Sequence, residues 1–229
     1  MKLHVGLLER YGGTPEEIEA RGLAAARALL PPMGLSPEQE TVALAVVRAT
    51  ADPTLAGLLR FHPRAVEEAV AALQRRATIV VDSNVTAAGL DSRLLTRLGC
   101  PPLVAISLPD AAQEAAHRRI TRSAAGMLLA RDALQGALAV VGTAPTALLA
   151  LLDMVDSGEA RPAAVVGVPV GLVAAPEAKE ELQRRPLPWI ALEGPRGGAA
   201  VAAAIVNAIM GIACRRSEAR EEAKGGDEQ

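Results

Sequence analysis

Small and polar residues follow four short apolar runs of the sequence, and their types suit the binding of a ligand. These loops are Asp82-Ser83-Asn84, Gly142-Thr143-Ala144-Pro145-Thr146, Gly167-Val168-Pro169-Val170-Gly171 and Gly194-Pro195-Arg196-Gly197-Gly198. Glycine lets the backbone turn tightly and approach a ligand closely. Gly197-Gly198 also opens the last predicted helix, whose free N–H groups could hold a carboxylate or a phosphate. Each loop alone is also an ordinary strand-to-helix turn, but four of them together favour a shared cleft.

Proton-transfer chemistry would need a His or a carboxyl group in that cleft. Of the three His residues, His4 lies at the start of the chain, and His117 lies on a polar helix face. His62 precedes Pro63 in a loop and is the strongest candidate of the three. The sequence has no Walker loop, no G-x-G-x-x-G with a spaced acid, no G-x-S-x-G and no H-E-x-x-H. Short motifs therefore identify no reaction.

Five short runs rich in β-branched residues predict the strands that carry these loops. The runs are fully apolar rather than alternating, which is typical of strands covered on both faces. Helical stretches separate most of them, and this alternation predicts an α/β fold: a mostly parallel sheet of about five strands with helices on both faces. Ligands of such sheets bind beyond the carboxyl ends of the strands, where the four loops would meet. The runs are 78–81, 103–106, 139–141, 164–166 and 189–191.

Two N-terminal helices are predicted from a repeated start signal. Thr14-Pro15-Glu16-Glu17 and Ser36-Pro37-Glu38-Gln39 each combine a capping hydroxyl, a Pro at the first helical position and a Glu or Gln three residues after the cap. They predict helices over about 15–30 and 37–50. We expect these N-terminal helices to pack onto the α/β body.

The composition is that of a folded protein, since 50% of the 229 residues are apolar and 22% are charged. We expect a single α/β domain over 1–214 and a charged, disordered tail over 215–229. The stretch 197–214 is mostly Ala and barely long enough to span a bilayer, so we expect a buried helix and no membrane partner. A net charge of −2 and an aromatic content of 1% argue against a nucleic-acid partner. Two Cys residues and no N-terminal apolar run indicate a cytoplasmic location.

An ordered set of short pieces, covering about residues 16–210, resembles the precorrin-8X methylmutase (precorrin isomerase) family of cobalamin biosynthesis. Each piece alone is weak, but their order and spacing make the resemblance specific. The pieces are Ala49-Thr50-Ala51-Asp52 with Leu59-Arg60-Phe61, Asp82 with Gly89, Thr121-Arg122-Ser123-Ala124-Ala125, Gly142-Thr143-Ala144-Pro145-Thr146-Ala147-Leu148, Pro169-Val170-Gly171 with Glu177 and Lys179, and Gly197-Gly198 with Asn207-Ala208.

The resemblance implies a methyl shift from carbon 11 to carbon 12 of a corrin precursor, giving hydrogenobyrinic acid or its cobalt form. It also implies a tetrapyrrole ligand (precorrin-8 or cobalt-precorrin-8), no cofactor, no metal site, and a homodimer with an enclosing cleft. In this family a His protonates the macrocycle and so assists the shift. Because the substrate carries many carboxylates, Arg side chains and backbone N–H groups are the expected binders.

Transferred to this chain, the family's site falls on residues of several predicted elements. The position of the catalytic His is Arg48, that of a substrate-binding Arg is Ala45, and that of a substrate-binding Ser is Gly22. The other expected substrate-binding residues are Thr50, Arg122, Thr143, Ala144, Pro145, Thr146, Gly167, Pro169, Gly171, Lys179, Arg196, Gly197 and Gly198.

Arg48 changes what the resemblance implies, because a guanidinium group does not release a proton near neutral pH. It could still pair with a substrate carboxylate or stabilise a negative charge. Three hypotheses follow. The chain is a methylmutase that uses another acid, His62 or a buried Asp82. It is a catalytically inactive or repurposed relative that binds a tetrapyrrole or another polyanion. Or it is a partner subunit of a true methylmutase.

Overall fold

One six-stranded sheet, in the order β1-β6-β5-β4-β2-β3, forms the centre of the fold. The structure, a computed structural model, describes residues 6–226, so His4 lies outside the described residues. All five predicted strands are present and pair in parallel, which confirms the expected sheet. They are β2 (Ile79–Val81), β3 (Pro102–Val104), β4 (Leu138–Val141), β5 (Ala164–Gly167) and β6 (Trp189–Leu192).

The sixth strand, β1 (Leu59–Phe61), was not predicted from the sequence. It has only three residues, the central one an Arg, so it lacks the β-branched run that marks the other strands. It pairs antiparallel with β6, with Leu59 opposite Leu192 and Phe61 opposite Ile190. Strand β1 therefore begins at the carboxyl edge of the parallel strands and ends at their amino edge.

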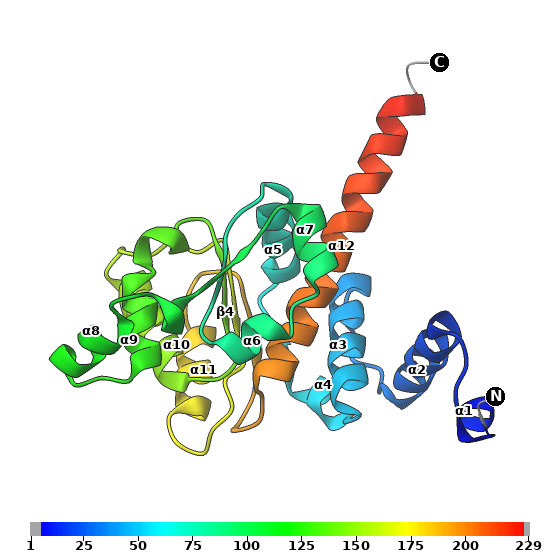
Figure 1. Cartoon of the computed structure of the whole chain (residues 1–229), viewed down its shortest axis with the longest axis horizontal. Coiled ribbons are helices and arrows are strands. Elements are labelled where there is room, and N and C mark those ends of the chain that lie inside the picture. Colours follow the sequence, from blue (N-terminus) through cyan, green and yellow to red (C-terminus); the bar gives the residue numbers. More distant parts are fainter. Residues whose placement is uncertain (1–5, 227–229) are drawn as a thin grey trace, which may run out of the picture.

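Alternate side chains of the strands enter two cores, one on each face of the sheet. Val81 and Val140 belong to one core, whereas Val80 and Val141 belong to the other. Both faces are thus covered by helices, which explains why the strand runs are apolar throughout. Figure 1 shows the two helical layers. They contain α3 (Pro37–Thr50), α5 (Ala65–Gln74) and α12 (Ala199–Gly226) on one face, and α9 (Arg122–Leu129), α10 (Pro145–Asp156) and α11 (Ala175–Gln183) on the other.

The N-terminal helices begin as predicted. In α2 (Pro15–Leu29) the Thr14 hydroxyl accepts from the backbone N–H of Glu17, whose carboxylate accepts from that of Thr14, and Ser36 and Gln39 cap α3 in the same way. Helix α3 is part of the core, whereas α2 buries only Ala26 among its residues. Figure 1 shows α1 (Gly6–Tyr11) and α2 beyond α3, away from the sheet.

Short helical segments connect the main elements. They are α4 (Thr54–Leu58), α6 (Asn84–Ala88), α7 (Ser92–Leu98) and α8 (Ala111–Arg118), with 3₁₀ turns at Ala105–Ser107 and Arg131–Leu134.

Helix α12 is a core helix, as expected. By length and composition it could cross a membrane, but 61% of its most apolar window is buried inside the protein. The helix continues to Gly226, so residues 215–226 are helical where the sequence predicted a disordered tail. Ion pairs of Arg216 with Glu38 and of Glu218 with Arg97 attach the start of this extension to the body.

Candidate functional site

Three of the four predicted loops lie side by side at the carboxyl edge of the sheet and are joined by backbone hydrogen bonds. Val168 N–H donates to the Val141 carbonyl at 2.9 Å, and Gly198 N–H donates to the Val168 carbonyl at 2.9 Å. Gly171 N–H donates to the Pro195 carbonyl at 3.0 Å. The loops after β4, β5 and β6 therefore form one continuous surface, which we call the edge surface.

Two glycines of the edge surface are required by close packing. Gly197 has φ +150°, and a Cβ atom there would lie 2.2 Å from the Val168 carbonyl oxygen. At Gly142 a Cβ atom would lie 2.7 Å from the Cβ of Ala202 in α12. Gly197 lets its loop pack against the backbone of the loop after β5, and Gly142 lets its loop pack against α12.

Asp82 lies beneath the edge surface, at the end of β2. Its carboxylate is fully buried and accepts from the backbone N–H groups of Gly142 at 3.2 Å, Thr143 at 2.7 Å and Ala144 at 2.9 Å. The Thr86 hydroxyl donates to it at 2.9 Å. Asp82, predicted as a possible acid, thus holds the loop after β2 against the loop after β4 and offers no exposed atom to a ligand.

The starts of α9 and α10 meet beside Thr143. The Thr121 and Thr146 hydroxyls share a hydrogen bond of 2.6 Å, and the Thr143 hydroxyl shares one of 2.7 Å with Ser83. Arg122, the first residue of α9, is exposed and donates from Nε to the Ile106 carbonyl at 3.0 Å. Three predicted binding residues, Arg122, Thr143 and Thr146, are therefore brought together. Ala144 and Pro145, half-buried, lie between them, whereas Gly167 and Pro169 are buried.

Arg196 connects the edge surface to the corner after α3. Its guanidinium pairs with Asp52 and donates to the Thr54 hydroxyl at 2.7 Å. Its backbone carbonyl accepts from Lys179 Nζ at 2.7 Å. Lys179, predicted as a substrate contact, is fully buried and supports the loop from below.

Burial lowers the pKa of Lys179 to about 8. Because the unfolded chain keeps this proton up to about pH 10, it binds more protons than the folded chain between these values. The contribution of Lys179 to the free energy of unfolding should therefore rise with pH from about 8 to about 10. Urea unfolding of the wild type and of Lys179→Met between about pH 8 and about pH 10 checks this prediction, because the difference between their free energies of unfolding should change with pH. A constant difference would contradict the prediction.

A second group of predicted residues lies on α2 and α3. Arg48, with a side chain 48% exposed, donates from a guanidinium N–H to Glu19 at 2.9 Å. A Cβ atom at Gly22 would lie 3.8 Å from Cδ of Arg48, and Ala45 is one turn earlier on α3. The three positions to which the resemblance assigns a His, an Arg and a Ser thus lie close together. Thr50 donates within its helix, to the Val46 carbonyl at 2.8 Å.

This α2–α3 group and the edge surface are joined through the Asp52–Arg196 pair. Within residues 6–226, no hydrogen bond or ion pair links Arg48 directly to the 142–146 loop. His62 is remote from the edge surface. Its backbone N–H donates to the carbonyl of Trp189, the first residue of β6, at 2.9 Å. The His62 and Trp189 rings meet edge-on, with their centroids 6.1 Å apart. Because Trp189 begins a parallel strand, His62 lies at the opposite edge of the sheet.

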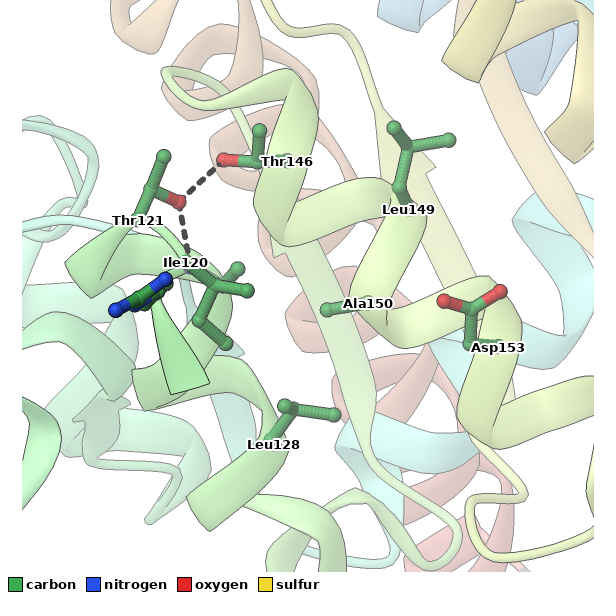
Figure 2. A pocket seen from close by; sticks show the side chains of 9 residues that line it. Ile120, Thr121, Leu128, Thr146, Leu149, Ala150 and Asp153 are labelled. Atoms are coloured by element: carbon green, nitrogen blue, oxygen red, sulfur yellow. Dashed lines mark hydrogen bonds between the residues drawn. The ribbon is translucent and has the colours of Figure 1, made fainter. Parts of the chain in front are cut away.

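A cavity of about 480 Å³ lies outside the sheet, between α9 and α10 (Figure 2). Its lining is apolar except for Arg119, Asp153 and the Thr121–Thr146 pair, so Thr146 is the only predicted site residue in it. This cavity could not be predicted from the sequence, because its apolar residues have the helical spacing of core positions. The part of the chain that the structure describes contains no group of three or more His, Cys, Asp or Glu side chains suited to a metal ion.

Comparisons with known proteins agree on one family. The family model for precorrin-8X methylmutase matches residues 17–212. Cobalt-precorrin-8 methylmutase of Methanocaldococcus jannaschii is 39% identical over 168 residues, which are 73% of this chain and 77% of that protein. Precorrin-8X methylmutase of Pseudomonas aeruginosa is 39% identical over 181 residues, 77% of this chain and 85% of that protein.

A crystal structure of precorrin-8X methylmutase from Thermus thermophilus superposes with a TM-score of 0.81 and 36% sequence identity, covering 86% of this chain and 96% of that one. A precorrin-8X methylmutase related protein superposes with a TM-score of 0.76 and 31% identity, covering 83% of this chain and 99% of that one. Sequence and fold therefore agree over the region that carries both the edge surface and the α2–α3 group. The chain belongs to the precorrin-8X methylmutase family.

Proposed function

We propose that the protein is a precorrin-8X methylmutase, which moves a methyl group from carbon 11 to carbon 12 of precorrin-8 or cobalt-precorrin-8. The observation that carries this proposal is the edge surface, formed by three loops of one sheet in a chain that matches the family from 17 to 212. An intramolecular methyl shift is an isomerisation, with no net change in electrons or protons, so the protein has to bind and orient the ring. The resemblance further implies that it donates a proton to the ring and that this proton is removed again when the product forms. No cofactor enters the proposal.

The charged groups around the edge surface suit a polycarboxylate ligand. Arg48, Arg122 and Arg196 have exposed or half-exposed guanidinium groups, and each is held by a partner: Glu19, the Ile106 carbonyl, and Asp52 with Thr54. Arg122, which is held by a backbone carbonyl, loses less side-chain entropy when it binds a carboxylate, whereas Glu19 and Asp52 compete with a ligand for Arg48 and Arg196. The planar fork of a guanidinium matches the two oxygens of a carboxylate. Precorrin-8 carries several such carboxylates at its rim.

A second candidate function is tetrapyrrole binding without the methyl shift, either alone or as a partner subunit of a methylmutase. It is favoured by the ion pair of Arg48 with Glu19 at the position of the family's acid. The two alternative acids are also poorly placed to donate a proton to the ring, since Asp82 is buried beneath the loops and His62 lies at the other edge of the sheet. Under this proposal the edge surface binds the ring but transfers no proton to it.

A cytoplasmic homodimer is part of the proposal. Helix α2 leaves three large apolar side chains largely exposed, Ile18 at 51%, Leu23 at 42% and Leu29 at 57%. A second copy would cover this surface, as exposed apolar faces of this kind commonly mark interfaces. Both cysteines, Cys100 and Cys214, are free and buried, which suits a reducing compartment. Analytical ultracentrifugation tests the oligomeric state.

A visible absorption titration with hydrogenobyrinic acid tests the binding step. A saturable spectral shift is expected, and Arg122→Ala should weaken the affinity by about 5- to 100-fold, the range for loss of a charge-assisted contact. Arg131→Ala is the matched control, because Arg131 is exposed just before the amino end of β4. Incubation with precorrin-8 then separates the two candidates by the appearance of product. The absence of any shift from a folded protein would contradict both.

A further inference from the structure

Arg196 is held at its backbone by a hydrogen bond, and its side chain forms an ion pair. Lys179 Nζ, which is fully buried, donates to the Arg196 carbonyl at 2.7 Å and so sets where this loop lies. The Arg196 side chain is 44% exposed, and among the described residues the hydrogen bonds and ion pairs of its guanidinium are with Asp52 and Thr54. The cation is therefore reachable from solvent, but a carboxylate of the same chain already occupies it.

Asp52 is held in a defined position by the turn that follows α3. One oxygen, Oδ1, accepts from the Thr54 backbone N–H at 2.9 Å and from the Thr54 hydroxyl at 2.6 Å. The other oxygen, Oδ2, pairs with Arg196. The turn starts at Ala51, which has a left-handed backbone with φ 54°. Asp52 therefore presents one oxygen to Arg196 from a rigid turn, unlike a long surface side chain that pairs in many conformations.

A second ion pair at the same edge differs in how it is built. Arg60 pairs with Glu193 at 2.7 Å, and the two side chains are 42% and 43% exposed. Arg60 also donates to the carbonyls of Gly57 and Leu59 at 2.9 and 2.8 Å, so its guanidinium is held by the backbone. Arg196 has no such backbone acceptor in the described residues. Of these two cations, Arg196 is the one that can exchange its partner.

We propose that Asp52 is a specificity-determining residue that occupies the Arg196 guanidinium until a ligand carboxylate replaces it. This inference rests on the proposed function, which supplies a ligand with several carboxylates. A monocarboxylate gains little from Arg196, because it must first displace Asp52. A polycarboxylate already held at other arginines presents a carboxylate at high local concentration and displaces Asp52 readily. The pair thereby selects for ligands with several carboxylates.

Asp52→Asn tests this exchange with little disturbance of the turn. The amide oxygen of Asn still accepts from Thr54, while the negative charge opposite Arg196 is lost. Titrated with hydrogenobyrinic acid, Asp52→Asn should bind about three- to fivefold more tightly than the wild type, the upper range for a half-exposed ion pair. In an Arg196→Met background, Asp52→Asn should change the affinity less than about twofold. Glu193→Gln is the matched control, since it removes one charge at the same edge and should also change the affinity less than about twofold.

The outcomes distinguish a failure of the inference from a failure of the proposed function. If the wild type binds and Asp52→Asn binds equally or more weakly, the inference is wrong and the proposed function stands. Equal tightening by Asp52→Asn and Glu193→Gln would also overturn it, because it would show a general charge effect. If neither the wild type nor Asp52→Asn binds, both proposals are overturned. Circular dichroism establishes that each variant is folded.

Discussion

Asp82→Ala is expected to lower the free energy of unfolding by about 3–5 kcal/mol, the largest stability effect of any single change at this site. The carboxylate is fully buried and accepts from three consecutive backbone N–H groups, those of residues 142–144. Alanine leaves these three donors without their acceptor, and the bond from Gly142 is itself buried. Urea unfolding followed by circular dichroism measures the loss, and a value below about 1 kcal/mol would contradict the role of Asp82 as the support of this loop.

Two further variants separate structural support from chemistry at Asp82. Asp132→Ala is the control, because its side chain is 97% exposed and should change the unfolding free energy by less than about 0.5 kcal/mol. Asp82→Asn keeps the shape of the side chain, but its NH₂ group faces a backbone N–H donor. We expect it to remain destabilised by about 2 kcal/mol or more. A variant with normal stability and no turnover would instead favour Asp82 as the acid.

The elements that the sequence predicts well are those with local causes. The capping boxes at Thr14 and Ser36 involve residues three apart, so both helix starts could be located from the sequence alone. The apolar strand runs reflect burial on both faces of the sheet. Strand β1 could not be predicted, because three residues with a central Arg form a strand only where β6 offers them a free edge. The charged composition of 215–226 predicts a disordered tail, and the Arg216–Glu38 pair at the start of this helical segment joins residues 178 positions apart.

The placement of the candidate site's loops could be predicted, but the direction of their side chains could not. The loops at Thr143 and Arg196 lie at the carboxyl edge, as the α/β pattern implies. Whether a polar residue there faces a ligand or supports a loop depends on distant partners. Asp82 meets backbone donors 60 to 62 residues later, and Lys179 meets a carbonyl 17 residues later. The antiparallel course of β1 places His62 at the opposite edge, which the sequence around His62 does not reveal.

Arg48→His is expected to raise the rate of methyl transfer by about 10²- to 10³-fold, the usual contribution of a positioned general acid. The resemblance places the family's acid at this position, and an imidazole can donate a proton near neutral pH, whereas a guanidinium cannot. Initial rates with precorrin-8, read from the absorbance of the product, measure the effect. The rate of the variant should fall as the pH rises above about 6.5, because the imidazole then loses the proton that it has to give.

The size of this gain depends on the groups around position 48. Glu19, which pairs with Arg48 in the wild type, could hold an introduced imidazole in its protonated form. The combined variant Gly22→Ser, Ala45→Arg, Arg48→His restores all three family residues and should exceed the single change, because an orienting cation and hydroxyl would fix the ring against the acid. Arg48→Lys keeps the charge without an imidazole and should leave the rate of methyl transfer unchanged. His62→Ala should leave turnover unchanged, since His62 lies at the other edge of the sheet. If the wild type turns over rapidly and Arg48→His slows it, Arg48 acts as a cation. The proton then comes from a group other than residues 22, 45 and 48.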